Sequence, residues 1–353
     1  MDVLIIYQFC TFGGVERAVL NRAKAFRKYP QNVNISVGYL HDYGALQSFQ
    51  SYIHANKLDD RLSAFLIAED SFSNLDKYDF VLVIDTPQVF ERILHAGNVY
   101  VECHTAYIEN RQYLKTIPQY VRGILVPSES FRRILASEFP NLPPISVLPN
   151  PVSEEFLEIQ SLNGNDFFPK RPITYFARLD DLKNISEATR IFKMFADAEE
   201  VMFFIIGKSP DEKALIHSLE HKGLIEKTLV RDGIVFDQAP FLVNLVKRHR
   251  GIFLSPSKGE SFGLSAAEFI SGGVPVLLSD IPAHKELVDN DERFLYRLGN
   301  IASAKKKIIN LLRDWDNMSV QTSKYAHKFR EDTFLKAWQN FMGDQKSGIE
   351  NRR

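Results

Sequence analysis

The chain has 353 residues, of which 45% are hydrophobic and 25% charged, and its formal net charge is −1. That length suits two globular domains, and the composition is that of folded protein rather than of a disordered chain. A net charge near zero argues against a general binder of polyanions, so no nucleic-acid partner is expected. The only cysteines are Cys10 and Cys103, too few for a disulfide framework or a cysteine-based metal site.

The sequence predicts a cytoplasmic protein. Its longest clean apolar run, residues 201–207, is far shorter than the roughly 20 residues that span a bilayer. The first residues lack the basic region and the length of a signal peptide. In the cytosol both thiols would be reduced.

Short apolar runs alternate with longer amphipathic stretches in the first half, as in parallel strands joined by crossover helices. Residues 16–29 are predicted to form a helix with an apolar face along Ala18, Val19, Ala23 and Phe26. The predicted strands are residues 3–7, 33–39, 80–84, 99–103 and 123–126.

The pattern breaks after residue 150 and then restarts. We expect a first domain over residues 1–150, a polar linker marked by Gly and Pro over 151–171 and a second domain over 172–320. Residues 321–353 are predicted to form a C-terminal helix with a frayed tail, and residues 301–343 as a whole read as helical. The second domain's predicted strands are 173–176, 201–206, 230–236, 251–255 and 274–278, with helices at 186–197, 210–222 and 262–271.

These elements predict the α/β class, with two doubly wound parallel-sheet domains. Such sheets bind ligands at the carboxyl ends of their strands. If the two domains face each other, those ends line a cleft, which is a common place for small substrates. Fold class alone does not establish the chemistry.

The segment 254–268 carries the densest chemical signal. A strand ends, a small polar loop carries Glu260, and a helix begins near Gly263 and Leu264 with Glu268 early in it. Free amides at a helix start suit a phosphate or diphosphate, and a glycine lets a ligand approach the backbone. The two carboxylates would repel phosphate, so they suit sugar or ribose hydroxyls instead. The alternative is an ordinary helix start with a solvated and a capping glutamate.

Two cations follow the strand at 173–176. Arg178 falls in the loop after this strand, and Lys183 lies five residues later at a helix start. A guanidinium and an ammonium together suit a diphosphate. The alternative is a pair of solvated loop cations.

Three residues of the first domain are further candidates. Gly13 and Gly14 follow the first strand and open the helix that contains Glu16, so their amides could meet a sugar or a diphosphate. A simple tight turn is the alternative, and Glu16 is interpreted as a first-turn helix acid. His104 directly follows the strand at 99–103, where a purely structural histidine is the alternative to a functional one.

Taken together, these motifs resemble retaining glycosyltransferases of the GT-B fold, and most closely glycosyltransferase family 4, the glycosyl transferases group 1. The resemblance covers nearly the whole chain. The motifs that carry it, in chain order, are Phe12-Gly13-Gly14-Val15-Glu16-Arg17, residues 126–130 and 147–152, the Arg178–Lys183–Asn184 element of 177–184, Glu260 with Glu268, Gly273-Val274-Pro275-Val276 and Glu286-Leu287-Val288.

The resemblance implies a retaining, hexosyltransferase-type enzyme that uses a nucleotide-diphosphate sugar, with UDP as the usual nucleotide. Arg178, Lys183, Glu260 and His104 would then be catalytic, with His104 near the reacting sugar. Gly13, Gly14, Gly263, Leu264 and Glu268 would bind the donor. It also implies that the last helix crosses back onto the first domain.

No cofactor beyond the substrate is expected, and the cations make a divalent metal unnecessary. No set of residues in the sequence is singled out as a metal site. The acceptor is left open as a glycan, a lipid-linked sugar or a small molecule, bound by loops such as 42–61 and 105–118. A lipid acceptor predicts a basic and aromatic surface, for which Arg111, Tyr113, Lys115 and Tyr120 are candidates, although a solvated helix face with at most weak peripheral membrane contact is the simpler interpretation.

Several positions depart from the family pattern. Ala177 replaces a glycine, Ser261 and Phe269 replace a glycine and a small residue, and residues 281–284 replace a glycine-rich loop. Gly207 opens a turn with less glycine than usual. We interpret these changes as differences in specificity.

Other functions compete with this interpretation. One is a non-catalytic partner subunit that binds a sugar nucleotide, and another is a GT-B-fold sugar-nucleotide epimerase or hydrolase. A Rossmann oxidoreductase is set aside, because the segment 12–14 lacks the G-x-G-x-x-G spacing.

Overall fold

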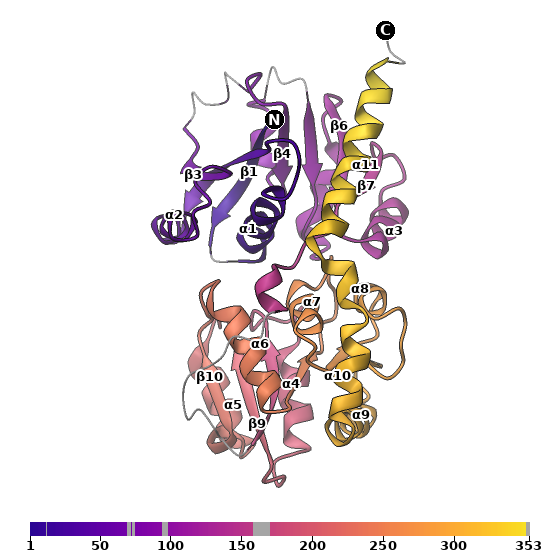
Figure 1. The fold of residues 1–353 in the computed structure, drawn as a ribbon. Helices are drawn as coiled ribbons and strands as arrows, with labels where there is room; N and C mark the ends of the chain where they lie inside the picture. Colours follow the sequence, from indigo (N-terminus) through magenta and orange to yellow (C-terminus); the bar gives the residue numbers. More distant parts are fainter. Residues whose placement is uncertain (12, 69–71, 73–74, 94–97, 158–169, 351–353) are drawn as a thin grey trace. The chain divides into compact units, whose positions relative to one another are not determined.

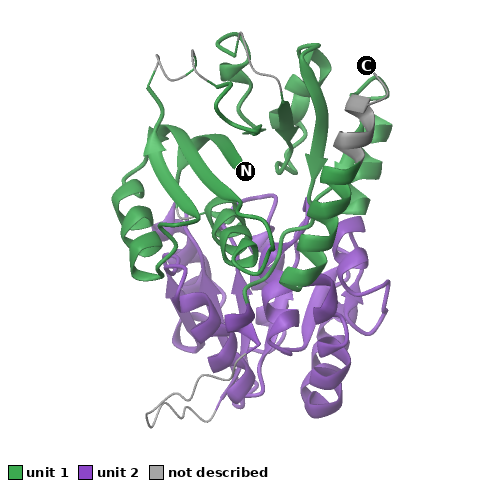
Figure 2. Ribbon diagram, turned by 45° about the horizontal axis from the view of Figure 1, so that its top comes forward, with its two compact units in different colours: residues 1–153, 330–353 green, residues 154–329 purple. Residues whose placement is uncertain are grey.

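The computed structural model describes residues 1–350 except 12, 69–71, 73–74, 94–97 and 158–169, with side chains described as far as 343. The chain divides into two compact units. Unit 1 comprises residues 1–153 and 330–353, and unit 2 comprises residues 154–329 (Figure 2). Both are parallel-sheet α/β units, which confirms the predicted fold class (Figure 1).

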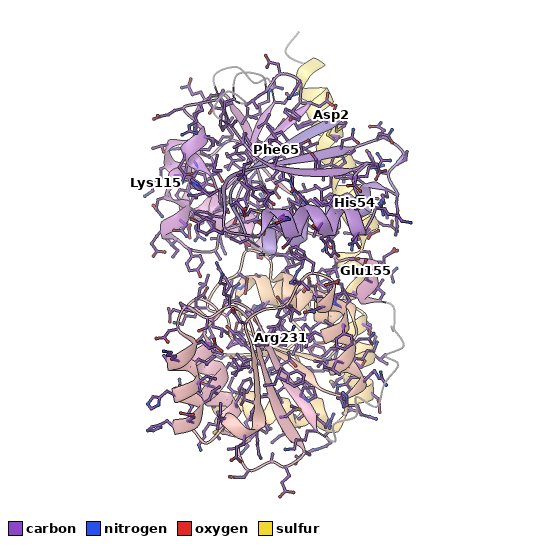
Figure 3. The ribbon with its side chains drawn as sticks, turned by 90° about the vertical axis from the view of Figure 1, so that its left-hand side faces the viewer. Asp2, His54, Phe65, Lys115, Glu155 and Arg231 are labelled. Carbon is purple, nitrogen blue, oxygen red and sulfur yellow. The ribbon has the colours of Figure 1, made fainter. Side chains whose placement is uncertain are left out.

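Unit 1 is built on a seven-stranded parallel sheet in the order β3-β2-β1-β4-β5-β6-β7. The order reverses direction between β1 and β4, which is the switch point where doubly wound sheets bind ligands. The strands are β1 Asp2–Cys10, β2 Asn34–Asp42, β3 Leu62–Leu66, β4 Phe80–Ile84, β5 Val99–Glu102, β6 Val121–Val126 and β7 Ile145–Val147, and the helices are α1 Gly14–Phe26, α2 Leu46–Ala55, α3 Glu129–Glu138 and α11 Glu331–Glu350. Asp2 opens β1, and His54 lies near the end of α2 (Figure 3).

Unit 2 has a six-stranded parallel sheet in the order β10-β9-β8-β11-β12-β13. Its switch point lies between β8 and β11, so the loops after these two neighbouring strands meet at one edge. The strands are β8 Arg171–Phe176, β9 Val201–Ile206, β10 Thr228–Arg231, β11 Ile252–Ser255, β12 Val276–Ser279 and β13 Leu295–Tyr296, and the helices are α4 Ile185–Lys193, α5 Glu212–His221, α6 Gln238–Arg248, α7 Leu264–Ser271, α8 Pro282–Leu287, α9 Ile301–Arg313 and α10 Trp315–Ser323.

The predicted strand at 230–236 is misplaced. β10 ends at Arg231, which Figure 3 labels, and the chain then leaves the sheet. Gly233 adopts a φ of +72°, a left-handed conformation that strands do not contain. The apolar residues Val235 and Phe236 therefore belong to the connection that leads to α6.

The end of the chain returns to unit 1. α11 packs against α1, and Trp338 and Phe334 make edge-to-face contacts with Phe26, with ring centroids 5.2 and 5.3 Å apart. The return begins at residue 330 rather than at 321, because Phe329 still packs in unit 2 against Phe262, with ring centroids 6.0 Å apart.

The structure differs from the predicted linker and from the predicted frayed tail. Residues 154–157 belong to unit 2 and pack against α6 and α7, while residues 158–169 of the predicted linker lie outside the described part of the chain. The sequence predicts a frayed tail, but α11 continues to Glu350, and residues 351–353 lie outside the described part.

Replacing Trp338 by Ala is expected to destabilise unit 1 by about 3–5 kcal/mol, because it removes a side chain that is only 2% exposed from the aromatic cluster between α11, α1 and β4. Urea unfolding followed by near-UV circular dichroism measures the change. Gln339→Ala on the exposed side of the same helix should stay within about 0.5 kcal/mol of the parent. An equally small effect for Trp338→Ala would contradict the packing of α11 on α1.

Candidate active site

The candidate site of unit 2 is formed by two loops at the carboxyl ends of β8 and β11. Residues 177–184 follow β8 and residues 256–263 follow β11. These loops are joined directly, because Lys258 N donates to Leu182 O at 2.8 Å and Asn184 Nδ2 donates to Pro256 O at 3.1 Å. The first loop is also held by β8, since the Tyr175 hydroxyl donates to Arg178 O at 2.8 Å.

Gly207, directly after β9, lets the loop after β8 approach its backbone closely. Its φ is +156°, and a Cβ at this position would lie 1.7 Å from Ala177 O. Leu179 N donates to Lys208 O at 3.0 Å across this close approach. No residue with a side chain fits here without moving the backbone that leads to Arg178.

Lys183 and Glu260 form an ion pair between the two loops. Lys183 Nζ lies 2.6 Å from both carboxylate oxygens of Glu260. Their side chains are 17% and 12% exposed. Burial opposes ionisation of Glu260, but Lys183, His284 and the Ser257 hydroxyl outweigh it and hold the pKa of this carboxyl below its usual value.

This pairing differs from the sequence-based expectation, which gave the two residues separate targets: phosphate for Lys183 and hydroxyls for Glu260. In the structure each is the other's partner. The physical reason is burial, because charges removed from water are stable only when they are paired and hydrogen-bonded.

Arg178 is the more accessible cation. Its side chain is 61% exposed, and its Nε lies 3.3 Å from Asp180 Oδ2. An exposed pair of this kind contributes little to stability. The guanidinium therefore sits on the loop that carries Lys183, close to solvent, as an anion-binding role requires.

The start of α7 has the geometry that the sequence predicts. Gly263 adopts φ +95° and ψ +52° directly before Leu264, and a Cβ on it would meet Leu287 Cδ1 at 3.2 Å. The first-turn amides of an eight-residue helix lack intrahelical acceptors and point outward from its amino end.

Glu268 lies deeper than the sequence indicates. It is 0% exposed within α7, so a ligand hydroxyl reaches its carboxylate only if neighbouring side chains move. Its predicted contact with the donor stays a prediction.

A chain of hydroxyls leads from Glu260 to a buried histidine that sequence reasoning treated only as a departure from the family pattern. Ser257 Oγ donates to Glu260 Oε1 at 2.8 Å and lies 3.2 Å from Ser255 Oγ. Ser255 Oγ is 3.4 Å from His284 Nε2, and His284 Nδ1 lies 2.9 Å from Ser279 Oγ and 3.0 Å from Ser279 O. Burial lowers the pKa of His284 to about 4, so the imidazole is neutral at pH 7.

In unit 1, the amide of Gly13 is already engaged. Gly13 N donates to Glu16 Oε2 at 2.8 Å, and Thr11 N donates to Glu16 Oε1 at 3.1 Å. Glu16 is 1% exposed and acts as the first-turn acid that the sequence predicts. In this structure the Gly13 N–H is bonded to Glu16, and its predicted contact with a donor stays a prediction. A Cβ on Gly14 would meet nothing within 4 Å, so ligand access at Gly14 stays a prediction.

His104 lies at the carboxyl end of β5, as predicted, and is bound to a residue that sequence reasoning missed. His104 Nε2 is 2.7 Å from Glu102 Oε1. Glu102 is 0% exposed and accepts a hydrogen bond from Arg22 NH1 at 2.9 Å. The i, i+2 spacing at the strand end was an available signal, because side chains two residues apart in extended chain point to the same face.

Three of the four candidates for a basic and aromatic surface of unit 1 are held by hydrogen bonds to other residues. Arg111 is 4% exposed, and its Nε donates to Glu138 Oε2 at 2.8 Å. Tyr113 donates to Asp85 Oδ1 at 2.9 Å, and Tyr120 donates to Phe90 O at 2.6 Å. Arg111 is thus buried and the two tyrosines are half-buried, whereas Lys115 is exposed.

A pocket of about 230 Å³ lies between α4 and α5, next to the loop after β8, which contributes Leu179 to its lining. Its lining includes neither Arg178, Lys183 nor Glu260, and its one ammonium, Lys222, is bound to Ser218. We therefore place the candidate site at the loops after β8 and β11, where the charged groups converge. The lining residues are Leu179, Ile185, Ser186, Thr189, Ser209, Pro210, Asp211, Leu215, Ser218 and Lys222.

Two kinds of feature are absent among the described residues. Among them, no three His, Cys, Asp or Glu side chains are grouped so as to hold a metal ion. None of the helices in this part of the chain has both the length and the apolar character needed to cross a bilayer.

The buried His284 predicts a pH dependence of stability. Its pKa of about 4 in the folded state lies below the value of about 6.5 of an exposed histidine. As the pH falls, His284 therefore takes up a proton in the unfolded chain before it does so in the folded protein. The contribution of the neutral imidazole to stability is complete above pH ~6.5 and declines as the pH falls toward 4. Between pH 7 and 5 the loss amounts to about 2 kcal/mol.

Urea unfolding at pH 7 and pH 5 measures this loss, which should be absent in His284→Gln. His217→Gln is the matched control, because His217 is 83% exposed and its replacement should leave the pH dependence of the parent unchanged. Equal pH dependence in the parent and in His284→Gln would contradict a buried neutral imidazole.

Comparison with known proteins concerns the domain that contains these two loops. Residues 164–329 match the family model Glycosyl transferases group 1. A sucrose synthase from Melioribacter roseus is 26% identical over 193 residues, which is 47% of this chain and 24% of that protein. The match thus spans about a quarter of that relative's length.

Solved structures share the fold over nearly the whole chain. One is S. aureus TarM in complex with fondaparinux, α-GlcNAc-glycerol and UDP, with a TM-score of 0.76 at 13% identity, covering 96% of this chain and 99% of TarM. Another is HepE from Anabaena in complex with UDP and glucose, with a TM-score of 0.74 at 15% identity, covering 98% of this chain and all of HepE (100%). The chain thus carries a Glycosyl transferases group 1 domain and has the fold of GT-B glycosyltransferases.

Proposed function

We propose that this protein is a retaining glycosyltransferase that moves a sugar from a nucleotide-diphosphate donor to an acceptor hydroxyl. The observation that carries the proposal is the Lys183–Glu260 pair, which lies in a Glycosyl transferases group 1 domain on the two loops that meet at the switch point. UDP is the proposed nucleotide, since TarM and HepE were both solved with UDP.

Donor binding would exchange the partners of this pair. A diphosphate at the two loops draws Lys183 Nζ and the exposed Arg178 guanidinium, and the first-turn amides after Gly263 add neutral donors. Glu260 then loses its ammonium partner and is free to accept hydrogen bonds from sugar hydroxyls. The Ser257 hydroxyl, which already donates to Glu260, keeps the carboxylate oriented during the exchange.

The same groups would promote the reaction. In sugar transfer the bond from the anomeric carbon to the diphosphate oxygen breaks, and negative charge builds on the leaving group. Preorganised cations and amides stabilise that charge more than they stabilise the bound donor. In the retaining scheme the leaving phosphate accepts the acceptor proton on the same face, and His104 hydrogen-bonds a substrate hydroxyl.

Two alternatives remain, and activity separates them from the proposal. A non-catalytic partner subunit would bind a nucleotide sugar without turning it over with any acceptor. A sugar-nucleotide epimerase would convert the donor without an acceptor. The proposed acceptors are a glycan, a lipid-linked sugar or a small molecule, so a panel of these classes is required.

Calorimetric titration with UDP, GDP and ADP, alone and as their glucose conjugates, tests the donor site. We expect Lys183→Ala and Arg178→Ala each to weaken binding of the preferred nucleotide by roughly 10–100-fold, because each removes a charge-assisted contact with phosphate. Arg250→Ala is the matched control, since Arg250 precedes β11 at its amino end and pairs with Asp316. If no nucleotide binds the parent protein, or if the control loses as much affinity as the two variants, the donor site is wrong.

We also propose that transfer needs no divalent metal, because Arg178, Lys183 and the α7 amides supply the stabilisation of the leaving group. Initial rates measured after EDTA treatment should equal those of the untreated enzyme. If EDTA lowers the initial rate and added Mg²⁺ or Mn²⁺ restores it, a metal stabilises the leaving group instead.

A further inference from the structure

The imidazole of His104 is held by a buried acid from its own strand. Its Nε2 lies 2.7 Å from Glu102 Oε1, while its side chain is 12% exposed and that of Glu102 is 0% exposed. The other ring nitrogen, Nδ1, has no hydrogen-bond partner among the described residues. One edge of the ring is thus anchored, and the other remains available.

Glu102 is itself held by Arg22 from α1. Arg22 NH1 donates to Glu102 Oε2 at 2.9 Å, and Arg22 NH2 contacts Oε1 and also donates to Asn150 Oδ1 at 3.1 Å. Arg22 is 3% exposed, so this pair is buried on both sides. Burial opposes ionisation, but Arg22 and His104 outweigh it and hold the pKa of Glu102 well below its usual range.

The charge state of Glu102 determines which imidazole nitrogen carries the proton. An ionised carboxylate has only acceptor lone pairs, so the ring nitrogen that faces it must donate. That nitrogen is Nε2, which leaves Nδ1 with a lone pair when the imidazole is neutral.

The backbone of His104 is fixed by a second acid. His104 N donates to Asp85 Oδ2 at 2.8 Å, and Asp85 Oδ1 accepts from Tyr113 at 2.9 Å. Asp85, directly after β4, adopts a φ of +41°, an unusual conformation for a residue other than glycine. The main chain and the ring of His104 are therefore set by carboxylates from neighbouring strands.

We propose that Glu102 is a positioning residue that fixes His104 with its proton on Nε2, so that Nδ1 accepts a hydrogen bond from a substrate hydroxyl. Arg22 keeps Glu102 charged and in place. This inference rests on the proposed function only for the identity of the ligand, which is a sugar hydroxyl of donor or acceptor. A purely structural Arg22–Glu102 pair would place no requirement on the imidazole tautomer.

The substitution Glu102→Gln separates these roles. In the parent Arg22 contacts both oxygens of Glu102, but its NH2 also has Asn150 Oδ1 as an acceptor, whereas its NH1 has only Glu102 Oε2 among the described residues. The amide oxygen of the glutamine therefore takes the Oε2 position facing NH1, and its NH₂ group takes the Oε1 position, which faces His104 Nε2. Nε2 must then accept, and the proton moves to Nδ1. A hydroxyl donor at Nδ1 would now meet an N–H group instead of a lone pair.

Nitrogen-15 NMR of the neutral imidazole, assigned by comparison with His104→Gln, reads the tautomer directly. We expect a protonated Nε2 in the parent and a protonated Nδ1 in Glu102→Gln. We also expect kcat to fall by roughly 10²–10⁴-fold in Glu102→Gln with little change in the donor KM, as for loss of a correctly oriented general-base or hydrogen-bonding histidine. Adding His104→Gln to Glu102→Gln should cause little further loss, because Glu102 acts through His104.

Glu138→Gln is the matched control. It converts an acid to an amide in the Arg111–Glu138 pair of the same unit, which no histidine contacts in the described residues. Its His104 tautomer and its kcat should equal those of the parent.

A parent protein with the proton on Nδ1, or a Glu102→Gln variant with an unchanged tautomer, would overturn the inference. The parent spectrum decides the matter even if Glu102→Gln does not fold. The expected tautomers together with no sugar transfer by the parent would uphold the positioning role of Glu102 and reject the proposed function.

Discussion

The ion pair between Lys183 and Glu260 is the interaction on which the organisation of unit 2 depends. It joins the loop after β8 to the loop after β11, at the point where the strand order reverses. Both side chains are mostly buried, so the loss of either one leaves an uncompensated charge. Breaking a buried pair in this way typically costs about 3–5 kcal/mol, whereas forming it adds little net stability. Such a pair is therefore better suited to positioning groups than to stabilising the fold.

Its surroundings explain why the pair is held so closely. The hydroxyls of Ser257 and Ser255 lead from Glu260 to the neutral His284, and Ser279 Oγ donates to Ser257 O at 2.6 Å. The carboxylate thus has a neutral partner as well as a charged one. In the proposed exchange, a diphosphate would remove Lys183 from Glu260 while the Ser257 hydroxyl continues to orient the carboxylate.

Unit 1 uses the same arrangement with different residues. Glu102 is bound on one side by a cation, Arg22, and on the other by His104, the side chain proposed to contact a substrate. In both units a buried acid at the carboxyl edge of a parallel sheet has a basic partner that keeps the carboxylate ionised.

The sequence predicts the fold class well because parallel strands are buried on both faces and form clear apolar runs. It fails where local chemistry overrides the apolar pattern, as at Gly233, where the predicted strand leaves the sheet. β7 and β13, with three and two residues, are too short to be distinguished from loops by pattern alone. β3 has five residues but lies at the edge of its sheet with Ser63 and Leu66 exposed, so it forms no clear apolar run.

The candidate site was only partly predictable. Arg178, Lys183, Glu260 and Gly263 are on the two joined loops, as their positions after strands indicate. The pairing of Lys183 with Glu260 joins residues 77 positions apart, and the burial of Arg111 depends on Glu138 in another element. Contacts of this kind follow from packing, which a single sequence does not specify.

A crystal structure of the protein with bound UDP tests the central claim most directly. The account predicts that a phosphate oxygen lies within hydrogen-bonding distance of Lys183 Nζ, beside the start of α7, and that the contact between Lys183 and Glu260 is lengthened or lost. A diphosphate bound elsewhere on unit 2, with the ion pair unchanged, would contradict it.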